Sequence, residues 1–217
     1  MNIAIIPARS GSKGIKDKNL REVGGHSLLA RAIHRAQDAK SVDEVFVSTD
    51  SNQYVLHALA VGATPILRPE ALATDGSSVV DAIFDVLLQI RHKPEYITLL
   101  QPSSPFVTSK DVDGAFEYIP HFDAVASVCV SDVYPDHLRW MNHKWELEPL
   151  YPLDQHTPRQ SMRVAHKITG GIYIIRTDVL FEHRTLLPPN TRGYLLNAKR
   201  SIDIDTQEDL NNARRHA

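Results

Sequence analysis

Short apolar segments alternate with helical patterns along most of the chain, and this alternation limits the fold more than any other feature. Segments rich in valine and isoleucine lie at 2–8, 44–50, 64–68, 96–102 and 123–131. Stretches with helical periodicity lie near 27–40, 53–61, 77–91, 109–119 and 207–215. Strands joined by helical crossovers give this order, and strands covered on both faces are apolar nearly throughout. The sequence therefore predicts an α/β fold built on a doubly wound, Rossmann-like sheet.

The alternation is interrupted between about 131 and 167. Proline, histidine, tryptophan and charged residues crowd together there, around Trp140, Trp145 and Tyr151. Apolar and polar residues alternate within this segment, which suggests a hairpin or small extended arm with exposed aromatic side chains. A long surface loop is the alternative, but loops of this length without a role are uncommon in compact domains. With 217 residues and 42% hydrophobic content, we expect one domain over 1–217 with an inserted arm at 131–167 that contacts a partner chain.

The charge balance and the single cysteine exclude several classes of partner and site. The formal net charge is -2, so the chain has no overall basic field for nucleic acid or an anionic membrane. Cys129 is the only cysteine, which excludes an intrachain disulfide and a cysteine-type zinc site and suits a reducing cytoplasm. The apolar segment at the N-terminus is too short for a signal or membrane segment. We therefore predict a cytoplasmic protein without a nucleic-acid or membrane partner.

The loop at 9–19 is the strongest functional signal. It follows the first apolar segment and contains Arg9, Lys13, Lys18 and two glycines, Gly11 and Gly14. Ligands of open α/β sheets bind beyond the carboxyl ends of the strands, and glycines let backbone N–H groups approach a phosphate closely. The converging cations would neutralise a triphosphate, so that an electron-rich oxygen could approach phosphorus. The loop matches neither the P-loop nor the dinucleotide fingerprint.

Two carboxylates near the end of the sequence are candidate metal ligands. Asp203 and Asp205 are two residues apart, so in an extended segment both would point to one face. Two adjacent acids repel each other unless a cation compensates them, and oxygen ligands with open positions suit Mg²⁺. Alternatively, Asp205 or Thr206 could cap the helix that follows, and such a cap is compatible with metal binding by Asp203.

Polar residues at two further strand ends could contact the substrates. The segment 101–105 places Gln101, Ser103 and Ser104 at the same sheet edge as the first loop, where neutral groups could recognise a hydroxyl-rich molecule, although such a sequence is also typical of a turn. Residues 66–69 and 74–78 could contact a base or ribose. Taken alone, Ser77 or Ser78 is better explained as the N-cap of the following helix.

Six motifs in order resemble those of the acylneuraminate cytidylyltransferase family, the CMP-sialic acid synthetases. They are IIPARSGSKGIKDKNL at 5–20, VFVSTD at 45–50, LRPEALATDGSS at 67–78, LLQPSSP at 99–105, PRQ at 158–160 and SIDIDTQEDL at 201–210. The resemblance covers nearly the whole chain, and its first and last motifs are the most specific. It implies a Rossmann-like nucleotidyltransferase and a homodimer built through the inserted arm.

The resemblance also implies roles for individual residues. The CTP site would consist of Arg9, Ser12, Lys13, Lys18, Asn19, Arg68 and Ser78. The acidic sugar would meet Gln101, with Arg159 reaching across the dimer. From their positions in this sequence, we expect Ser103, Lys167 and Thr169 to contact the sugar as well. Asp203 and Asp205 would hold Mg²⁺, while Arg9, Lys13 and Asp205 would act in catalysis. The implied reaction is attack by the anomeric hydroxyl of a 2-keto sugar acid on the α-phosphorus of CTP, with release of pyrophosphate.

The segment 166–171 departs from the family pattern and leaves the acceptor open. Lys167 stands where the family commonly has arginine or tyrosine, and Thr169 replaces an amide side chain. Sialic acid or another nonulosonate is the main expectation, and an octulosonate or a phosphonate is the alternative. A non-catalytic nucleotide-binding homologue is a different class, but the phosphate ligands and metal ligands are all present, which favours an enzyme. A sugar transferase with the Asp203–Asp205 motif is disfavoured, because such enzymes usually carry this motif in mid-chain.

Overall fold

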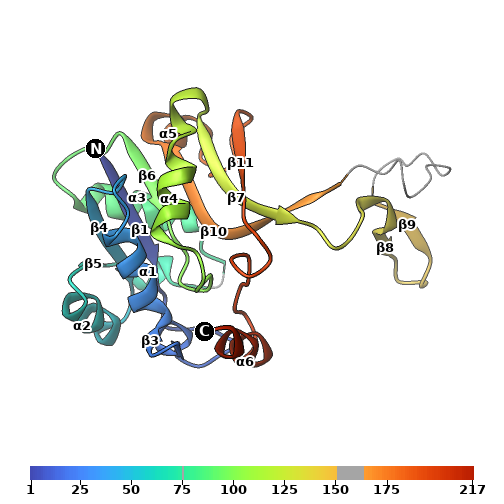
Figure 1. The fold of residues 1–217 in the computed structure, drawn as a ribbon, viewed down its shortest axis with the longest axis horizontal. Coiled ribbons are helices and arrows are strands. Elements are labelled where there is room, and N and C mark those ends of the chain that lie inside the picture. The colour runs from blue at the N-terminus through green and yellow to red at the C-terminus, as the bar shows by residue number, and fades with distance from the viewer. Residues whose placement is uncertain (75, 151–163) are drawn as a thin grey trace.

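A seven-stranded sheet runs through the computed structural model, which describes residues 1–74, 76–150 and 164–217 (Figure 1). The strand order is β11-β7-β10-β6-β1-β4-β5. The strands are β1 (Asn2–Pro7), β4 (Glu44–Thr49), β5 (Thr64–Leu67), β6 (Tyr96–Leu99), β7 (Ala124–Val130), β10 (His166–Arg176) and β11 (Thr191–Leu195). Neighbouring strands are parallel except at β10, which is antiparallel to β6 and β7. The predicted fold class is confirmed, with one reversed strand.

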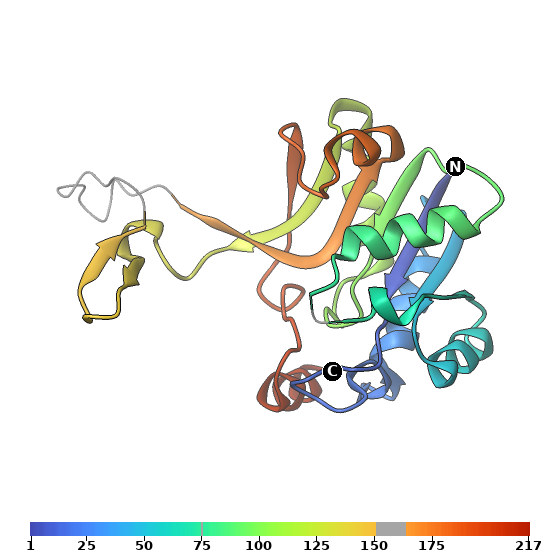
Figure 2. The ribbon, with the colours of Figure 1, turned by 180° about the vertical axis from the view of Figure 1, so that it is seen from behind.

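Helices cover both faces of this sheet (Figures 1 and 2). One buried cluster joins the sheet to α1 (Leu28–Gln37), α2 (Asn52–Ala60) and α4 (Ser109–Phe116). A second buried cluster joins the other face to α3 (Val79–Gln89) and α5 (Thr177–His183). Each face thus has its own apolar layer, as expected for a sheet whose strands are apolar throughout.

Local capping fixes where several helices begin. The side chains of Ser27 and Ser78 accept hydrogen bonds from backbone N–H groups at the starts of α1 and α3. Thr108 and Thr206 form capping boxes at the starts of α4 and α6 (Gln207–His216). The predicted helix at each of these places exists, although it ends one to several residues earlier than the pattern indicated, except at α6.

Smaller elements complete the fold. Two-residue strands β2 (Glu22–Val23) and β3 (His26–Ser27) pair after the first loop, and short 3-10 helices lie at η1 (Lys18–Leu20), η2 (Glu70–Leu72) and η3 (Ile119–His121). Within the described residues, no helix is long and apolar enough to cross a membrane.

A small hairpin projects from the body of the molecule at the place of the predicted arm (Figures 1 and 2). It consists of η4 (Pro135–His137) and the antiparallel strands β8 (Arg139–Met141) and β9 (Leu147–Pro149). Trp140 is 63% exposed and Trp145 is 79% exposed. Strand β10 begins at His166, within the last two residues of the predicted arm, and pairs with β7 from its first residue.

Candidate active site

A cavity of about 440 Å³ lies beyond the carboxyl ends of β1, β5 and β6. It gathers ten of the predicted site residues, namely Arg9, Ser12, Lys13, Lys18, Asn19, Arg68, Ser78, Gln101, Ser103 and Asp205. Its described lining contains four cationic side chains and one carboxylate, so it provides a local positive field in a chain of slightly negative net charge. A polyanion is therefore the ligand that the cavity favours.

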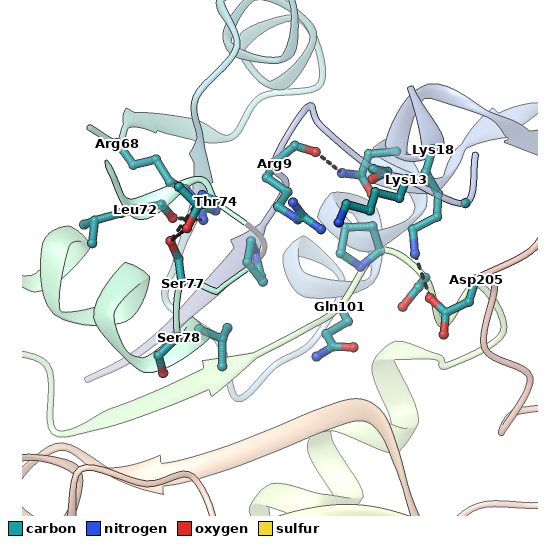
Figure 3. A pocket seen from close by; sticks show the side chains of 17 residues that line it. Arg9, Lys13, Lys18, Arg68, Leu72, Thr74, Ser77, Ser78, Gln101 and Asp205 are labelled. Carbon is teal, nitrogen blue, oxygen red and sulfur yellow. Dashed lines mark hydrogen bonds and ion pairs between the residues drawn. The ribbon is translucent and has the colours of Figure 1, made fainter. Parts of the chain in front are cut away.

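The loop at 9–19 is held in place by its neighbours. The backbone N–H and the hydroxyl of Ser10 each donate a 2.8 Å hydrogen bond to the carboxylate of Asp50, which follows β4. Asn19 is buried and donates from Nδ2 to the carbonyl oxygen of Arg9, at 3.1 Å. Figure 3 shows the side chains of Arg9 and Lys13 between the two ends of the cavity. Asp50 and Asn19 thus fix the loop that carries Arg9 and Lys13.

The end of the cavity nearest the C-terminal segment joins this loop to Asp205 (Figure 3). Lys18 Nζ lies 3.0 Å from Asp205 Oδ1 and 2.9 Å from the carbonyl oxygen of Ile204. A Cβ atom at Gly14 would stand only 2.2 Å from the backbone oxygen of Asp205. Glycine is required at 14 because the two backbones approach each other so closely.

Asp203 and Asp205 do not both face this cavity. Asp203 instead lines a second cavity of about 890 Å³, while its neighbour Ser103 lines the first cavity. Burial raises the pKa of the Asp203 carboxyl and the nearby Asp205 raises it further, while the Ser103 hydroxyl and Lys18 lower it. The two carboxylates are therefore close in space although they line different cavities.

Thr206, and not Asp205, caps the last helix. Thr206 accepts a hydrogen bond from the N–H of Asp209 and is the N-cap of α6, so neither Asp203 nor Asp205 is needed for that purpose. Within the described residues, no three His, Cys, Asp or Glu side chains converge on a point. Two carboxylates fit a cation that completes its coordination with water and substrate phosphate, as Mg²⁺ does.

At the opposite end of the cavity, Arg68 and two serines hold local structure (Figure 3). Arg68 is buried and donates to the carbonyl oxygens of Ser48, at 2.6 Å, and Leu72, at 3.4 Å. Burial lowers the pKa of its guanidinium. Ser78 caps α3, and the Ser77 hydroxyl lies 2.7 Å from that of Thr74. Arg68 and Ser78 line the cavity as predicted, but both also shape the segment that closes it.

The turn after β6 contains Gln101 and Ser103 and rests on a buried arginine. Arg35 of α1 is 4% exposed and donates to the carbonyl oxygens of Gln101 and Ser104. Burial, and secondarily the neighbouring Arg31, lower the pKa of Arg35 to about 9. Its charge is thus retained at neutral pH.

The remaining predicted acceptor residues lie elsewhere. Lys167 and Thr169 line the second cavity together with Asp203, and Lys167 Nζ lies 3.9 Å from Asp132. Thr169 is buried, with its hydroxyl 2.6 Å from that of Ser127, beside the register shift between β10 and β7. Its hydroxyl is therefore engaged within the protein. Arg159 lies outside the described residues.

Several residues at the site were not predicted from the sequence. Asp50 follows a strand, a position that could have indicated a role in the site. Arg35 carries no such signal, because an arginine on an amphipathic helix is expected to face water. Arg200 donates from Nη1 to the buried carboxylate of Asp111, at 2.7 Å, and so ties the segment before Asp203 to α4. Local sequence patterns do not predict pairs of residues that lie so far apart in the chain.

A polyphosphate-sized basic cavity at the edge of a Rossmann-like sheet, with the Asp205 carboxylate at one end and Asp203 two residues away, defines a nucleotidyltransferase. The family model described as cytidylyltransferase matches residues 3–139. The chain belongs to this cytidylyltransferase family, whose members are nucleotide-binding enzymes.

Curated relatives support the same assignment. CMP-N,N'-diacetyllegionaminic acid synthase of Legionella pneumophila is 33% identical over 95% of this chain and 92% of its own length. N-acylneuraminate cytidylyltransferase of Streptococcus agalactiae is 30% identical over 96% of this chain, which spans 51% of that relative. Pseudaminic acid cytidylyltransferase of Campylobacter jejuni is 26% identical over 96% of this chain and 93% of its own length.

Solved structures share the fold. A CMP:2-keto-3-deoxy-manno-octonic acid synthetase complexed with CTP matches with a TM-score of 0.75 and 20% identity, over 99% of this chain and 97% of the other. A 4-diphosphocytidyl-2C-methyl-D-erythritol synthase from Anaerococcus prevotii matches with a TM-score of 0.70 and 13% identity, over 100% and 95% of the two chains. The Rossmann-like nucleotidyltransferase fold is thereby confirmed.

Proposed function

We propose that this enzyme transfers CMP from CTP to the anomeric hydroxyl of an acidic 2-keto sugar, a sialic acid or a related nonulosonate, and releases pyrophosphate. The observation that carries the proposal is the cavity beyond β1 and β6, where Arg9, Lys13 and Lys18 face one another near Asp205. The relatives at 30–33% identity are named for CMP transfer to such acids.

The cationic loop accounts for the phosphate half of the reaction. Arg9 and Lys13 would neutralise the triphosphate and, as pyrophosphate departs, the charge that develops on it. Ser12 and Asn19 lie in the same loop, and the anchoring of Ser10 by Asp50 keeps it in one arrangement. A fixed loop reduces the reorganisation needed when the transition state forms.

The cytidine half would lie toward Arg68 and Ser78. These residues border the end of the cavity opposite Lys18, and the segment 69–74 closes that end. The α-phosphorus would then lie between the base and Asp205.

Asp203 and Asp205 would hold Mg²⁺. The ion supplies charge neutralisation to the phosphates and lowers the pKa of a coordinated hydroxyl. The remaining work belongs to the protein: Lys18 holds Asp205 at 3.0 Å, and the carbonyl of Ser103 holds the backbone between the two acids by accepting a hydrogen bond from Ile204. Both carboxylates are thereby oriented in advance.

The acceptor would lie between Gln101 and the second cavity. Gln101 and Ser103 offer neutral hydrogen-bonding groups, and Lys167 offers a cation for the carboxylate of the sugar acid. Thr169 would contribute by shaping the second cavity. An octulosonate or a phosphonate is the alternative acceptor, because a lysine binds a carboxylate less selectively than the bidentate arginine does.

We further propose a cytoplasmic homodimer formed through the arm at 131–167, with Arg159 of one chain directed to the other chain's acceptor site. The exposure of Trp140 and Trp145 supports a partner surface, because large aromatic side chains are enriched in interfaces.

Pyrophosphate release with CTP and Mg²⁺ tests the function. The acceptors are N-acetylneuraminate, a legionaminate, a pseudaminate, an octulosonate and a phosphonate, with ATP, GTP and UTP as nucleotide controls. We expect release with CTP and a nonulosonate. Release with the octulosonate or phosphonate alone would correct the acceptor, and silence with every acceptor, while CTP still raises the melting temperature, would favour a non-catalytic nucleotide-binding protein.

A further inference from the structure

Among the residues that the structure describes, Arg35 is a buried cation whose hydrogen bonds go to two backbone carbonyls and to no carboxylate. Its guanidinium donates from Nη2 to the carbonyl oxygen of Gln101 and from Nη1 to that of Ser104, and the neighbouring charge of Arg31 acts against its own. Burying a charge without an opposite charge is unfavourable, and an apolar side chain at this place in α1 would avoid that penalty. The arginine therefore has a use that packing alone does not explain.

The two carbonyls that Arg35 binds lie at the two ends of one turn. Each precedes a proline, Pro102 or Pro105, so the rings already restrict the backbone between them. The N–H of Ser104 donates back to the carbonyl of Gln101, at 3.3 Å, and closes the turn. Arg35 thus fixes the whole turn with a single planar group, which has five donors in a rigid geometry.

Strand β10 restrains the same turn from another direction. A Cβ atom at Gly170 would stand 2.9 Å from Gln101 Oε1, and one at Gly171 would stand 3.3 Å from Ser104 Cβ. Gly170 has a φ of +76°, a conformation that glycine adopts without strain. The turn is therefore held between α1 and β10, with little room to move on either side.

This turn connects α1 to the carboxylates. The carbonyl of Ser103 accepts a 2.9 Å hydrogen bond from the N–H of Ile204, and the Ser103 hydroxyl is near enough to Asp203 to lower the pKa of its carboxyl. Gln101 lines the cavity itself. A shift of the turn would therefore move an acceptor-binding side chain and the Asp203–Asp205 segment together.

We infer that Arg35 is a positioning residue for the acceptor side of the reaction, which acts by fixing the turn 101–104 and, through Ser103, the segment 203–205. This inference rests on the proposed function. The phosphate loop is anchored separately, by Asp50 and Asn19, so loss of Arg35 should affect the acceptor and the cation more than CTP.

The test compares Arg35→Met, Arg35→Lys and Arg31→Met. Arg31 is the matched control because it lies one turn earlier in α1, and its bonds go to the carbonyls of Pro105 and Val23, outside the turn. We expect Arg35→Met to raise the KM for the acceptor and lower kcat, on the order of 10- to 100-fold in kcat/KM, and to raise the magnesium concentration for half-maximal activity. CTP binding without acceptor should change by less than about threefold, and Arg35→Lys should restore part of the loss.

Amide hydrogen exchange gives a second readout that does not depend on activity. In Arg35→Met, the Ser104 and Ile204 amides should exchange faster than in the wild type, and in Arg31→Met they should not. If Arg35→Met does not fold, the same measurements on Arg35→Lys decide the question. The inference fails if these amides keep their protection, or if CTP and acceptor binding fall equally. A wild-type enzyme without cytidylyl transfer would refute the proposed function instead, and the exchange result would still decide whether Arg35 fixes the turn.

Discussion

Lys18 Nζ lies 3.0 Å from the carboxylate of Asp205, a residue 187 positions away in the sequence. The same ammonium group binds the carbonyl of Ile204, so it fixes both the charge and the backbone of this segment. A lysine predicted to bind phosphate thus also holds a predicted metal ligand. The two halves of the site are coupled before any substrate arrives.

Neutralising the Asp203 carboxylate should abolish magnesium-dependent turnover. We expect Asp203→Asn to reduce turnover by on the order of 100-fold or more at any magnesium concentration, because an amide is a poor ligand for a hard cation. Glu208→Gln is the control, since Glu208 is an exposed acid in the first turn of α6. Pyrophosphate release across a magnesium titration measures both, and an unchanged titration in Asp203→Asn would remove Asp203 from the cation site.

A methyl group at position 14 should separate the loop from the carboxylate segment. In Gly14→Ala the new Cβ would overlap the Asp205 carbonyl, so one backbone must shift, with a loss of about 1–3 kcal/mol in the free energy of unfolding and a large loss of turnover. Gly11→Ala is the matched control, because a Cβ there meets nothing within 4 Å. Urea denaturation and kinetics on both variants make the comparison. Equal behaviour would show that the contact between the two segments is unimportant.

Lys13 should contribute to turnover far more than to folding. Lys13→Ala removes a cation from the cavity wall and should lower kcat/KM on the order of 100-fold, with little change in melting temperature. Lys16→Ala, an exposed lysine of the same loop that does not line the cavity, should keep near-normal activity. Near-normal activity in Lys13→Ala would place Lys13 outside the phosphate site.

A charge on the arm should dissociate the proposed homodimer. We expect Trp140→Glu to shift the protein from dimer to monomer in light scattering after gel filtration, because a carboxylate would be buried without a partner. Leu88→Glu is the control, since Leu88 is 85% exposed on α3, on the body of the molecule. A wild-type monomer, or a dimer in both variants, would contradict the role given to the arm.

Tyr54 should make the protein less stable in alkali. Burial, and secondarily Asp17 and Asp50, raise the pKa of this phenol to about 12, whereas in the unfolded chain it ionises near 10. Between these pH values the unfolded state loses the proton and the folded state keeps it, so stability falls as pH rises, by roughly 2–3 kcal/mol in all. Urea denaturation at pH 9 and at pH 11.5 measures the fall in the free energy of unfolding between these pH values. Tyr54→Phe should make this fall smaller, whereas Tyr118→Phe, at a more exposed tyrosine, should not. If the free energy of unfolding falls as steeply in Tyr54→Phe as in the wild type, other groups cause the loss of stability in alkali.

Much of the fold follows from local pattern, because buried parallel strands and capped helices leave strong signals in the sequence. The helices α1, α3, α4 and α6 begin beside Ser27, Ser78, Thr108 and Thr206, as capping preferences predict. The reversal of β10 could not be predicted, since strand direction depends on how the chain returns from the arm. The segment 177–195 was also missed, because α5 has seven residues and β11 has five.

The parts of the candidate site that consist of charged residues in short motifs could be predicted from the sequence. The loop at 9–19 meets the acid segment through the contact of Lys18 with Asp205, as expected. Asp203 and Asp205 line different cavities, and the alternation rule that placed both acids on one face stays a prediction. That rule holds for regular strands, and this segment makes its contact with Ser103 outside the sheet. Arg35 was missed because its partners are backbone carbonyls, which have no sequence signature.

The contact between the first loop and the acids also bears on the order of folding. Pairings across 186 or more residues form late, because the entropy of closing so long a loop must be met before the contact adds stability. An intermediate in which the sheet has formed but residues 202–205 are undocked would hold its phosphate-binding cations without their carboxylates. Catalytic competence would then appear as one of the last events of folding, so recovery of activity during refolding should lag behind recovery of the sheet.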